Sequence, residues 1–429
     1  MNGAVALVGL ALLGYGVFEG RLQRTVVSGA MVFTAVGLLA SDQVTGLITT
    51  SSHSHDATAF LEVTLVIVLF TDAMAINATR WATEAPLPGR LLGVGLPLTI
   101  VVGWLLAAAL IGGIGIWGAA LLAAVLAPTD SALGLSVITD RRVPLLIRHA
   151  LNVEGGLNDG LALPFVTVFL ALALQEEGAV GGGHVLLVVL RALASAVIGA
   201  AVGGGGTLLL CWSMRRGWSA RHWRSVALLA MAVLAFALAD LIEGSGFIAA
   251  WVAGLVAGLT SRGTLDEAQQ TPEDVANLAI SISFVLFGGL FLAPALEHAT
   301  WTALAYALLS LTVIRAIPVA VALLGANLAA PTFAYVGWFG PRGLASIVFA
   351  DLVATSGLPD QSTIVTVVML TVGLSVVLHG VTAPWGASRY AQWYARAVVA
   401  TPDLREAAEA PPVRYRVRVT QGQPPDLDQ

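Results

Sequence analysis

The sequence predicts an all-α polytopic membrane protein with about 13 transmembrane helices. Of the 429 residues, 57% are hydrophobic and only 11% are charged, whereas soluble domains carry about 25% charged residues. The apolar residues lie in runs near the roughly 20-residue length that spans a bilayer. The 46 glycines fit close helix packing in lipid. The single cysteine, Cys211, excludes an internal disulfide and a cysteine-based metal cluster.

Apolar runs divide the chain into predicted spans. The first run has no basic residues before it and no clear cleavage site, so we expect a retained helix instead of a signal peptide. The predicted spans are 2–18, 26–42, 58–77, 91–111, 114–138, 145–174, 185–211, 225–241, 245–260, 275–294, 301–324, 332–354 and 361–384.

The arginines predict the orientation of these spans. The sequence contains no lysine, and arginines fall beside every second connection from the first to the ninth, while connections such as 41–56 and 175–184 contain none. Cytoplasmic loops carry the positive charge, so the amino terminus is expected outside and the carboxyl terminus inside. The arginines in question are Arg21, Arg24, Arg80, Arg90, Arg141, Arg142, Arg148, Arg215, Arg216, Arg221, Arg224 and Arg262.

Two predicted spans contain helix-breaking residues. Pro128 interrupts span 114–138, and Gly340, Pro341 and Gly343 surround Arg342 in span 332–354. A broken helix survives at membrane depth only when it is buried in protein or lines a wet cavity. One interrupted span in each half of the chain indicates a transporter built from two inverted repeats.

Three carboxylates, Asp130, Glu154 and Asp159, lie in or beside these spans. An ionisable group at a helix centre costs roughly 2.5–3.5 kcal/mol on insertion and usually marks an ion or proton pathway. Glu154 and Asn158 share one helix face, and Gly155 and Asp159 share another. We therefore expect Asp159 to face a cavity, Asn158 to brace the neighbouring broken helix, and Gly155 to leave space for an ion or water.

Neighbouring residues complete this candidate site. Thr129 and freed carbonyls offer the oxygen ligands that hard cations prefer, and Asp130 would offset the half-helix dipoles. We expect Glu154 to pair with Arg342, because an unpaired buried charge is costly. Two other intramembrane arginines, at 191 and 315, are interpreted as partners of carbonyls or as snorkelling side chains. A packed helix with protonated or hydrogen-bonded acids is the alternative.

Four motifs in order resemble those of the monovalent cation:proton antiporters of the NhaP/NHE type. The resemblance covers about residues 1–385. The matching segments are Phe70-Thr71-Asp72, Ala127-Pro128-Thr129-Asp130, Glu154 to Asp159, and Gly340-Pro341-Arg342-Gly343.

The resemblance implies an architecture and a mechanism. It implies a core domain of two inverted repeats with unwound crossing helices (about 91–174 and 301–384). Beside the core it implies a dimerisation domain (about 1–77 and 185–260), a linker helix (about 275–294), a short cytoplasmic tail (386–429) and a homodimer. It further implies elevator-like alternating access in the cell membrane and electroneutral exchange of Na⁺, or of Li⁺ or K⁺, for H⁺. No cofactor is expected.

The resemblance also assigns roles to residues. The positions of Asp159 and Thr129 would bind the transported Na⁺, with Asp159 taking a proton in its place. Glu154 and Arg342 would form a structural pair, and Asp72 would be accessory. Two residues depart from the motifs: Ser131 replaces a proline, and Gly155 replaces a serine that donates an oxygen ligand, so the cation would lack one ligand.

Two other function classes require different sequence features. A cation channel should show rings of repeated polar residues and needs no titrating acid. An intramembrane aspartyl protease needs two convergent acids, which Asp130 and Asp159 could supply, but the sequence lacks a Gly-x-Gly-Asp element. These comparisons favour an exchanger over a pore or an enzyme.

Overall fold

The computed structural model describes residues 2–22, 25–48, 50–76, 86–131, 133–401 and 403–408, and these residues form helices and connecting turns without any strand. The first half contains α1 (Asn2–Leu22), α2 (Gly29–Ala40), α3 (Thr50–Met74), α5 (Pro86–Arg90), η1 (Leu91–Gly95), α6 (Leu96–Leu110), α7 (Gly115–Val125), α8 (Leu135–Thr139), α9 (Leu145–Glu176) and α10 (His184–Arg215). The second half contains α11 (Arg221–Asp240), α12 (Gly246–Ser261), α13 (Gln270–Leu286), η2 (Phe287–Leu292), α14 (Ala293–Glu297), α15 (Trp301–Leu311), α16 (Val313–Ala322), α17 (Ala330–Trp338), α18 (Leu344–Thr355), α19 (Gln361–Ala400) and η3 (Arg405–Ala407).

The helices are those of a membrane protein. Within the described residues, 9 helical stretches are long and apolar enough to cross a bilayer, and four shorter apolar helices accompany them. Each predicted apolar run falls on one of these helices or on consecutive helices. The predicted class, an all-α polytopic membrane protein, is therefore confirmed.

The two predicted helix breaks are present, and they touch each other. The first break (residues 126–134) separates α7 from α8, and the second break (residues 339–343) separates α17 from α18. The backbone N–H of Asp130 in the first break donates to the carbonyl of Pro341 in the second, at 2.7 Å. Each break thus satisfies part of the backbone that the other leaves free, as burial in a membrane requires.

Glycines allow α12 to lie close against α10 and α3. A Cβ on Gly199 or Gly203 of α10 would overlap the carbonyls of Ala249 and Ala253 on α12. A Cβ on Gly254 of α12 would likewise overlap α3. Gly199, Gly203 and Gly254 therefore serve helix packing, because only a missing side chain lets backbones approach so closely.

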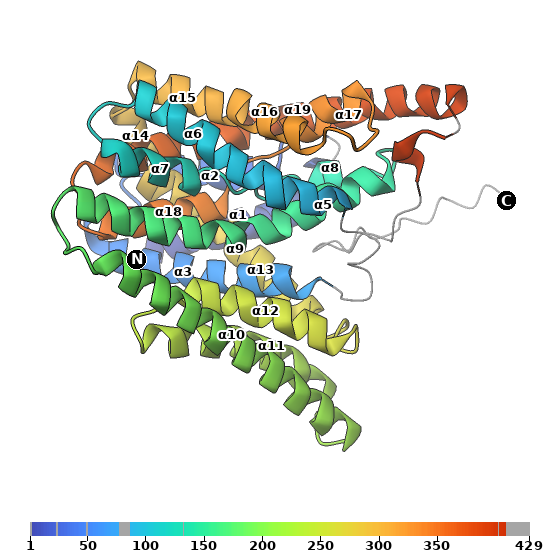
Figure 1. The fold of residues 1–429 in the computed structure, drawn as a ribbon, viewed down its shortest axis with the longest axis horizontal. Coiled ribbons are helices and arrows are strands. Elements are labelled where there is room, and N and C mark those ends of the chain that lie inside the picture. The colour runs from blue at the N-terminus through green and yellow to red at the C-terminus, as the bar shows by residue number, and fades with distance from the viewer. Residues whose placement is uncertain are drawn as a thin grey trace.

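Helix α9 lies between two groups of helices. On one side it contacts α3, α10 and α12, and on the other it contacts α7, α8 and α18. Figure 1 shows α10, α11 and α12 along one edge of the molecule and α15, α16 and α19 along the opposite edge, with α9 between them. Side chains on α9 can therefore reach either group.

The last helix is longer than predicted. The sequence predicts that the membrane part ends at residue 385, but α19 continues through Ala400, because nothing after Pro384 breaks it. After α19, Glu406 of η3 folds back onto the first turn of α17. Its buried carboxylate accepts hydrogen bonds from Ala329 N at 2.8 Å and from Thr332 Oγ1 at 2.6 Å. Residues 409–429 of the predicted tail lie outside the described part of the chain.

Candidate functional site

Asp130 caps the half-helix α18. Its Oδ2 accepts a hydrogen bond from Leu344 N at 3.0 Å, and its Oδ1 accepts one from Leu133 N at 3.3 Å. The carboxylate thus lies at the positive end of a helix that begins inside the protein, where a negative charge is stabilising. Gly343 makes this approach possible, because a Cβ there would overlap Asp130 Oδ2.

Thr129 and Asn158 connect the first break to α9. The Asn158 amide donates from Nδ2 to Thr129 Oγ1 at 2.6 Å, and the exposed fractions of the two residues are only 1% and 4%. Asn158 thus joins α9 to the first break, and its part in binding the ion or proton stays a prediction. Within the described residues, the buried Oδ1 of Asn158 has no hydrogen-bond partner.

Asp159 lies on α9 directly after this bracing residue. It is buried, with 7% of its surface exposed. Gly155 precedes it by one helical turn and packs against Ser131 of the first break, so that a Cβ on Gly155 would lie 3.0 Å from Ser131 Cβ. On a different side of α9, the Cβ of Asp72 on α3 would lie 3.6 Å from a Cβ added at Gly156. The accessory acid named from the sequence therefore does reach α9.

Glu154 pairs with a different arginine from the one that was predicted from the sequence. Both Glu154 oxygens accept hydrogen bonds from Arg315 of α16: Nη1 donates to Oε1, and Nη2 donates to Oε2 at 2.8 Å. Both side chains are 4% exposed. The interpretation of Arg315 as a carbonyl partner or a snorkelling side chain is therefore wrong. Gly340 leaves room for this guanidinium, because a Cβ there would crowd Arg315 Nε.

The predicted pairing of Glu154 with Arg342 is also wrong, because the Arg342 side chain donates to backbone carbonyls. The guanidinium of Arg342 donates to the carbonyls of Ala127 at 2.9 Å, Pro128 at 3.0 Å and Ser310 at 3.4 Å. Two of these carbonyls belong to the first break, where no helical amide claims them. Arg342 thus donates from its Nη atoms to freed backbone and holds the two breaks together.

Two polar residues of α19 support the second break and were not predicted. The hydroxyl of Ser375 accepts a hydrogen bond from Arg342 N at 2.7 Å, and it lies 3.2 Å from His379 Nδ1. His379 Nε2 lies 3.0 Å from the carbonyl of Trp338, the last residue of α17. The sequence does contain a signal for this contact. A serine and a histidine four residues apart in an apolar span share one helix face and can act together.

The family follows from this arrangement together with the sequence. A family model described as "Sodium/hydrogen exchanger, transmembrane" matches residues 7–388, which include both breaks and all of α9. The chain belongs to the sodium/hydrogen exchanger family. The resemblance expected from the four motifs is confirmed, and the chain is a multi-pass membrane protein.

Individual relatives agree with this assignment. The K(+)/H(+) antiporter NhaP of Alkalimonas amylolytica is 29% identical to this chain over 367 residues. The aligned residues cover 85% of this chain and 62% of the relative. The chain therefore spans less than two thirds of that relative's length.

Solved structures share the fold. The structure of the sodium proton antiporter MjNhaP1 of Methanocaldococcus jannaschii at pH 8 superposes on this chain with a TM-score of 0.73 at 19% identity. The superposition covers 91% of this chain and 98% of MjNhaP1. A second structure of MjNhaP1, from an electron-microscopy map, gives a TM-score of 0.75 at 18% identity, over 91% and 97%. At such identities the likeness shows the fold alone.

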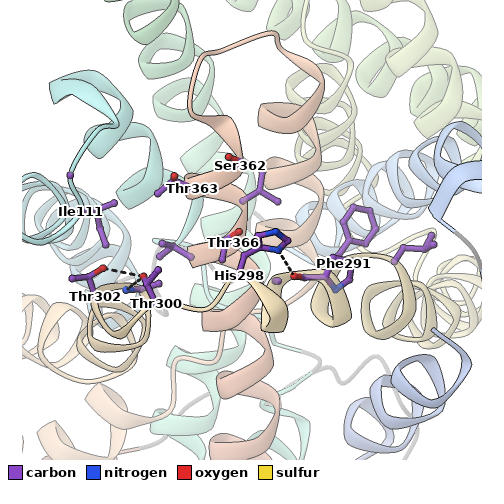
Figure 2. A pocket seen from close by; sticks show the side chains of 15 residues that line it. Ile111, Phe291, His298, Thr300, Thr302, Ser362, Thr363 and Thr366 are labelled. Atoms are coloured by element: carbon purple, nitrogen blue, oxygen red, sulfur yellow. Dashed lines mark hydrogen bonds between the residues drawn. The ribbon is translucent and has the colours of Figure 1, made fainter. Parts of the chain in front are cut away.

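The protein also has a large cavity, and the residues that line it are different from those of the site described above. Figure 2 shows this cavity of about 550 Å³ between the ends of α6, α14, α15 and α19. Hydroxyl groups line it, among them Thr363 and Thr366, and His298 Nδ1 lies 3.0 Å from the carbonyl of Pro294. None of Thr129, Asp130 and Asp159 lines it.

A surface ion pair lies in the connection between α8 and α9. Arg142 donates from Nε to Asp140 Oδ1 at 3.0 Å and from Nη2 to Oδ2 at 2.7 Å. Partial burial of Asp140 alone would raise its pKa, but these hydrogen bonds and the charge of Arg142 outweigh burial and lower the pKa below its ordinary value. The pair thus keeps Asp140 ionised where the chain enters α9.

Proposed function

We propose that this protein exchanges a monovalent cation, in the first place Na⁺, for H⁺ across the membrane. The observation that carries this proposal is Asp159, a buried acid on α9 directly after the residue that braces the first break. An acid at such a depth can hold either a proton or a cation. Because one carboxylate cannot hold both at once, a site that opens alternately to each side of the membrane is sufficient for exchange.

The neighbouring side chains have separate roles in this proposal. Thr129 contributes an oxygen ligand, and Asn158 holds it in place through their 2.6 Å hydrogen bond. Asp130 neutralises the positive end of α18, which would otherwise repel a cation. Since Asn158 carries no charge, one Na⁺ replaces one H⁺ on Asp159, and the exchange is electroneutral.

The movement proposed for exchange divides the protein into two parts. The core (about 91–174 and 301–384) carries Asp159 and both breaks. It moves against a dimerisation scaffold (about 1–77 and 185–260), to which it is joined by a linker helix (about 275–294). The protein is a homodimer in the cell membrane, with its amino terminus outside. The position of α9 between the two helix groups supports this division, because movement there would change the surroundings of Asp159.

K⁺ is the second candidate for the transported cation. The relative that is 29% identical is named a K(+)/H(+) antiporter. The proposed site supports K⁺ and Na⁺ alike, because carboxylate and hydroxyl oxygens bind either ion.

Proteoliposomes that contain a pH-sensitive dye test the proposal. Addition of Na⁺, Li⁺ or K⁺ should drive proton movement between about pH 6 and 9, and a clamped membrane voltage should not change the rate. Asp159→Asn should abolish the signal. Asp240→Asn, which changes an exposed acid at the end of α11, should retain it. Cation-driven proton movement by Asp159→Asn would refute the assignment of the site.

A further inference from the structure

The two residues that depart from the family motifs touch each other. A Cβ added at Gly155 would lie 3.0 Å from Ser131 Cβ and 3.3 Å from Ser131 N. Such distances are below ordinary van der Waals contact, so the absence of a side chain at Gly155 is what lets Ser131 lie against α9. A side chain at position 155 would therefore have to displace Ser131 by a few tenths of an ångström.

A small cavity opens at this contact. It has a volume of about 10 Å³, which suits one water molecule or one small ion. Thr129, Asp130, Ser131 and Gly155 are among the residues that line it. Hard cations bind oxygen ligands at roughly 2.3–2.6 Å, so side-chain oxygens around a space of this size can reach a single ion.

Most oxygens around this cavity already have partners. Both carboxylate oxygens of Asp130 accept backbone amides, and the Thr129 hydroxyl accepts from Asn158. In the described part of the chain, the Ser131 hydroxyl has no hydrogen-bond partner. Among the side-chain oxygens of this cavity, the Ser131 hydroxyl is therefore the one that no hydrogen bond holds in place, so it is free to turn to a bound ion.

The cavity is also close enough to Asp159 for a shared ion. Gly155 and Asp159 lie one turn apart on the same face of α9, about 6 Å along its axis. We infer that the Ser131 hydroxyl is a ligand of the transported cation and reaches it across the space that Gly155 leaves open. This inference rests on the exchange proposed above and adds to it a residue that tunes cation preference.

Moving the hydroxyl to the opposite helix tests the inference. In proteoliposomes, Ser131→Ala should raise the half-saturating Na⁺ concentration about tenfold and change the maximal rate less. Li⁺ should be affected as much as Na⁺ and K⁺ less, because a smaller ion is hydrated more strongly and loses more when an oxygen that replaces its hydration is removed. Ser131→Gly/Gly155→Ser returns a hydroxyl from α9 and should restore the Na⁺ value to within roughly threefold.

A matched double variant separates the hydroxyl from packing. Ser131→Gly/Gly155→Ala restores the bulk of a side chain without oxygen and should not rescue. Equal rescue by alanine and serine at Gly155, or a wild-type Na⁺ value for Ser131→Ala, would overturn the inference. If Ser131→Ala does not fold, the isosteric pair Ser131→Thr and Ser131→Val gives the same comparison. Wild-type protein and Asp159→Asn are measured in the same vesicles, so a failure of exchange itself is seen separately.

Discussion

Replacing Arg315 alone should be among the most destabilising changes in this protein. Arg315→Met removes two hydrogen bonds to Glu154 and leaves that carboxylate, 4% exposed, without its partner. Loss of one partner of a buried ion pair costs about 3–5 kcal/mol, because the remaining charge stays buried. Glu154→Gln should be costly for the same reason. The double variant leaves no unpaired charge, so its cost should fall below the sum by about 1–3 kcal/mol.

Thermal unfolding in detergent, followed by tryptophan fluorescence, measures these differences. The same cycle of Glu154→Gln with Arg342→Met should show weaker coupling, because Arg342 donates to backbone carbonyls instead of to Glu154. Arg221→Met is the control, since its ion pair with Glu267 is solvent-exposed and worth at most about 1 kcal/mol. If Glu154 couples more strongly to Arg342 than to Arg315, the assignment of the pair is refuted.

Two further substitutions test the contacts of the first break. Gly343→Ala should abolish exchange in proteoliposomes, because its Cβ would overlap Asp130 Oδ2, whereas Gly205→Ala has open space around it and should behave as wild type. Thr129→Val should lower the free energy of unfolding by about 1–3 kcal/mol, and with it the unfolding temperature, because the Asn158 amide loses its acceptor. Thr129→Ser keeps the hydroxyl and should be tolerated. Equal stability of the serine and valine variants would contradict this prediction.

The sequence was sufficient for the helices and for both breaks. Long apolar runs have few alternatives to helix in a membrane. Pro128 and the segment Gly340–Gly343 mark the places where helical hydrogen bonds cannot continue. Spacing along α9 also separated the face of Asn158 from that of Asp159, but the partner of Asn158, Thr129, became known only from the structure.

The partner of Glu154 was not predictable, because spacing along one helix says nothing about which helix lies opposite. Arg342 stood out through its glycine and proline neighbours. Those same neighbours free the backbone of the second break, while the Arg342 side chain donates to carbonyls of the first. Arg315 lies on a helix with ordinary neighbours, and only the packing of α16 near α9 brings it to Glu154.

The hydrogen bonds of Glu406 have a practical consequence for work on this chain. A polypeptide cut at Ala400 would lose the acceptor that Ala329 and Thr332 share at the first turn of α17. That helix leads straight into the second break, so removal of η3 would loosen the packing next to that break. Affinity tags and protease sites therefore belong after residue 408, and vesicle measurements on shorter versions would describe an altered protein.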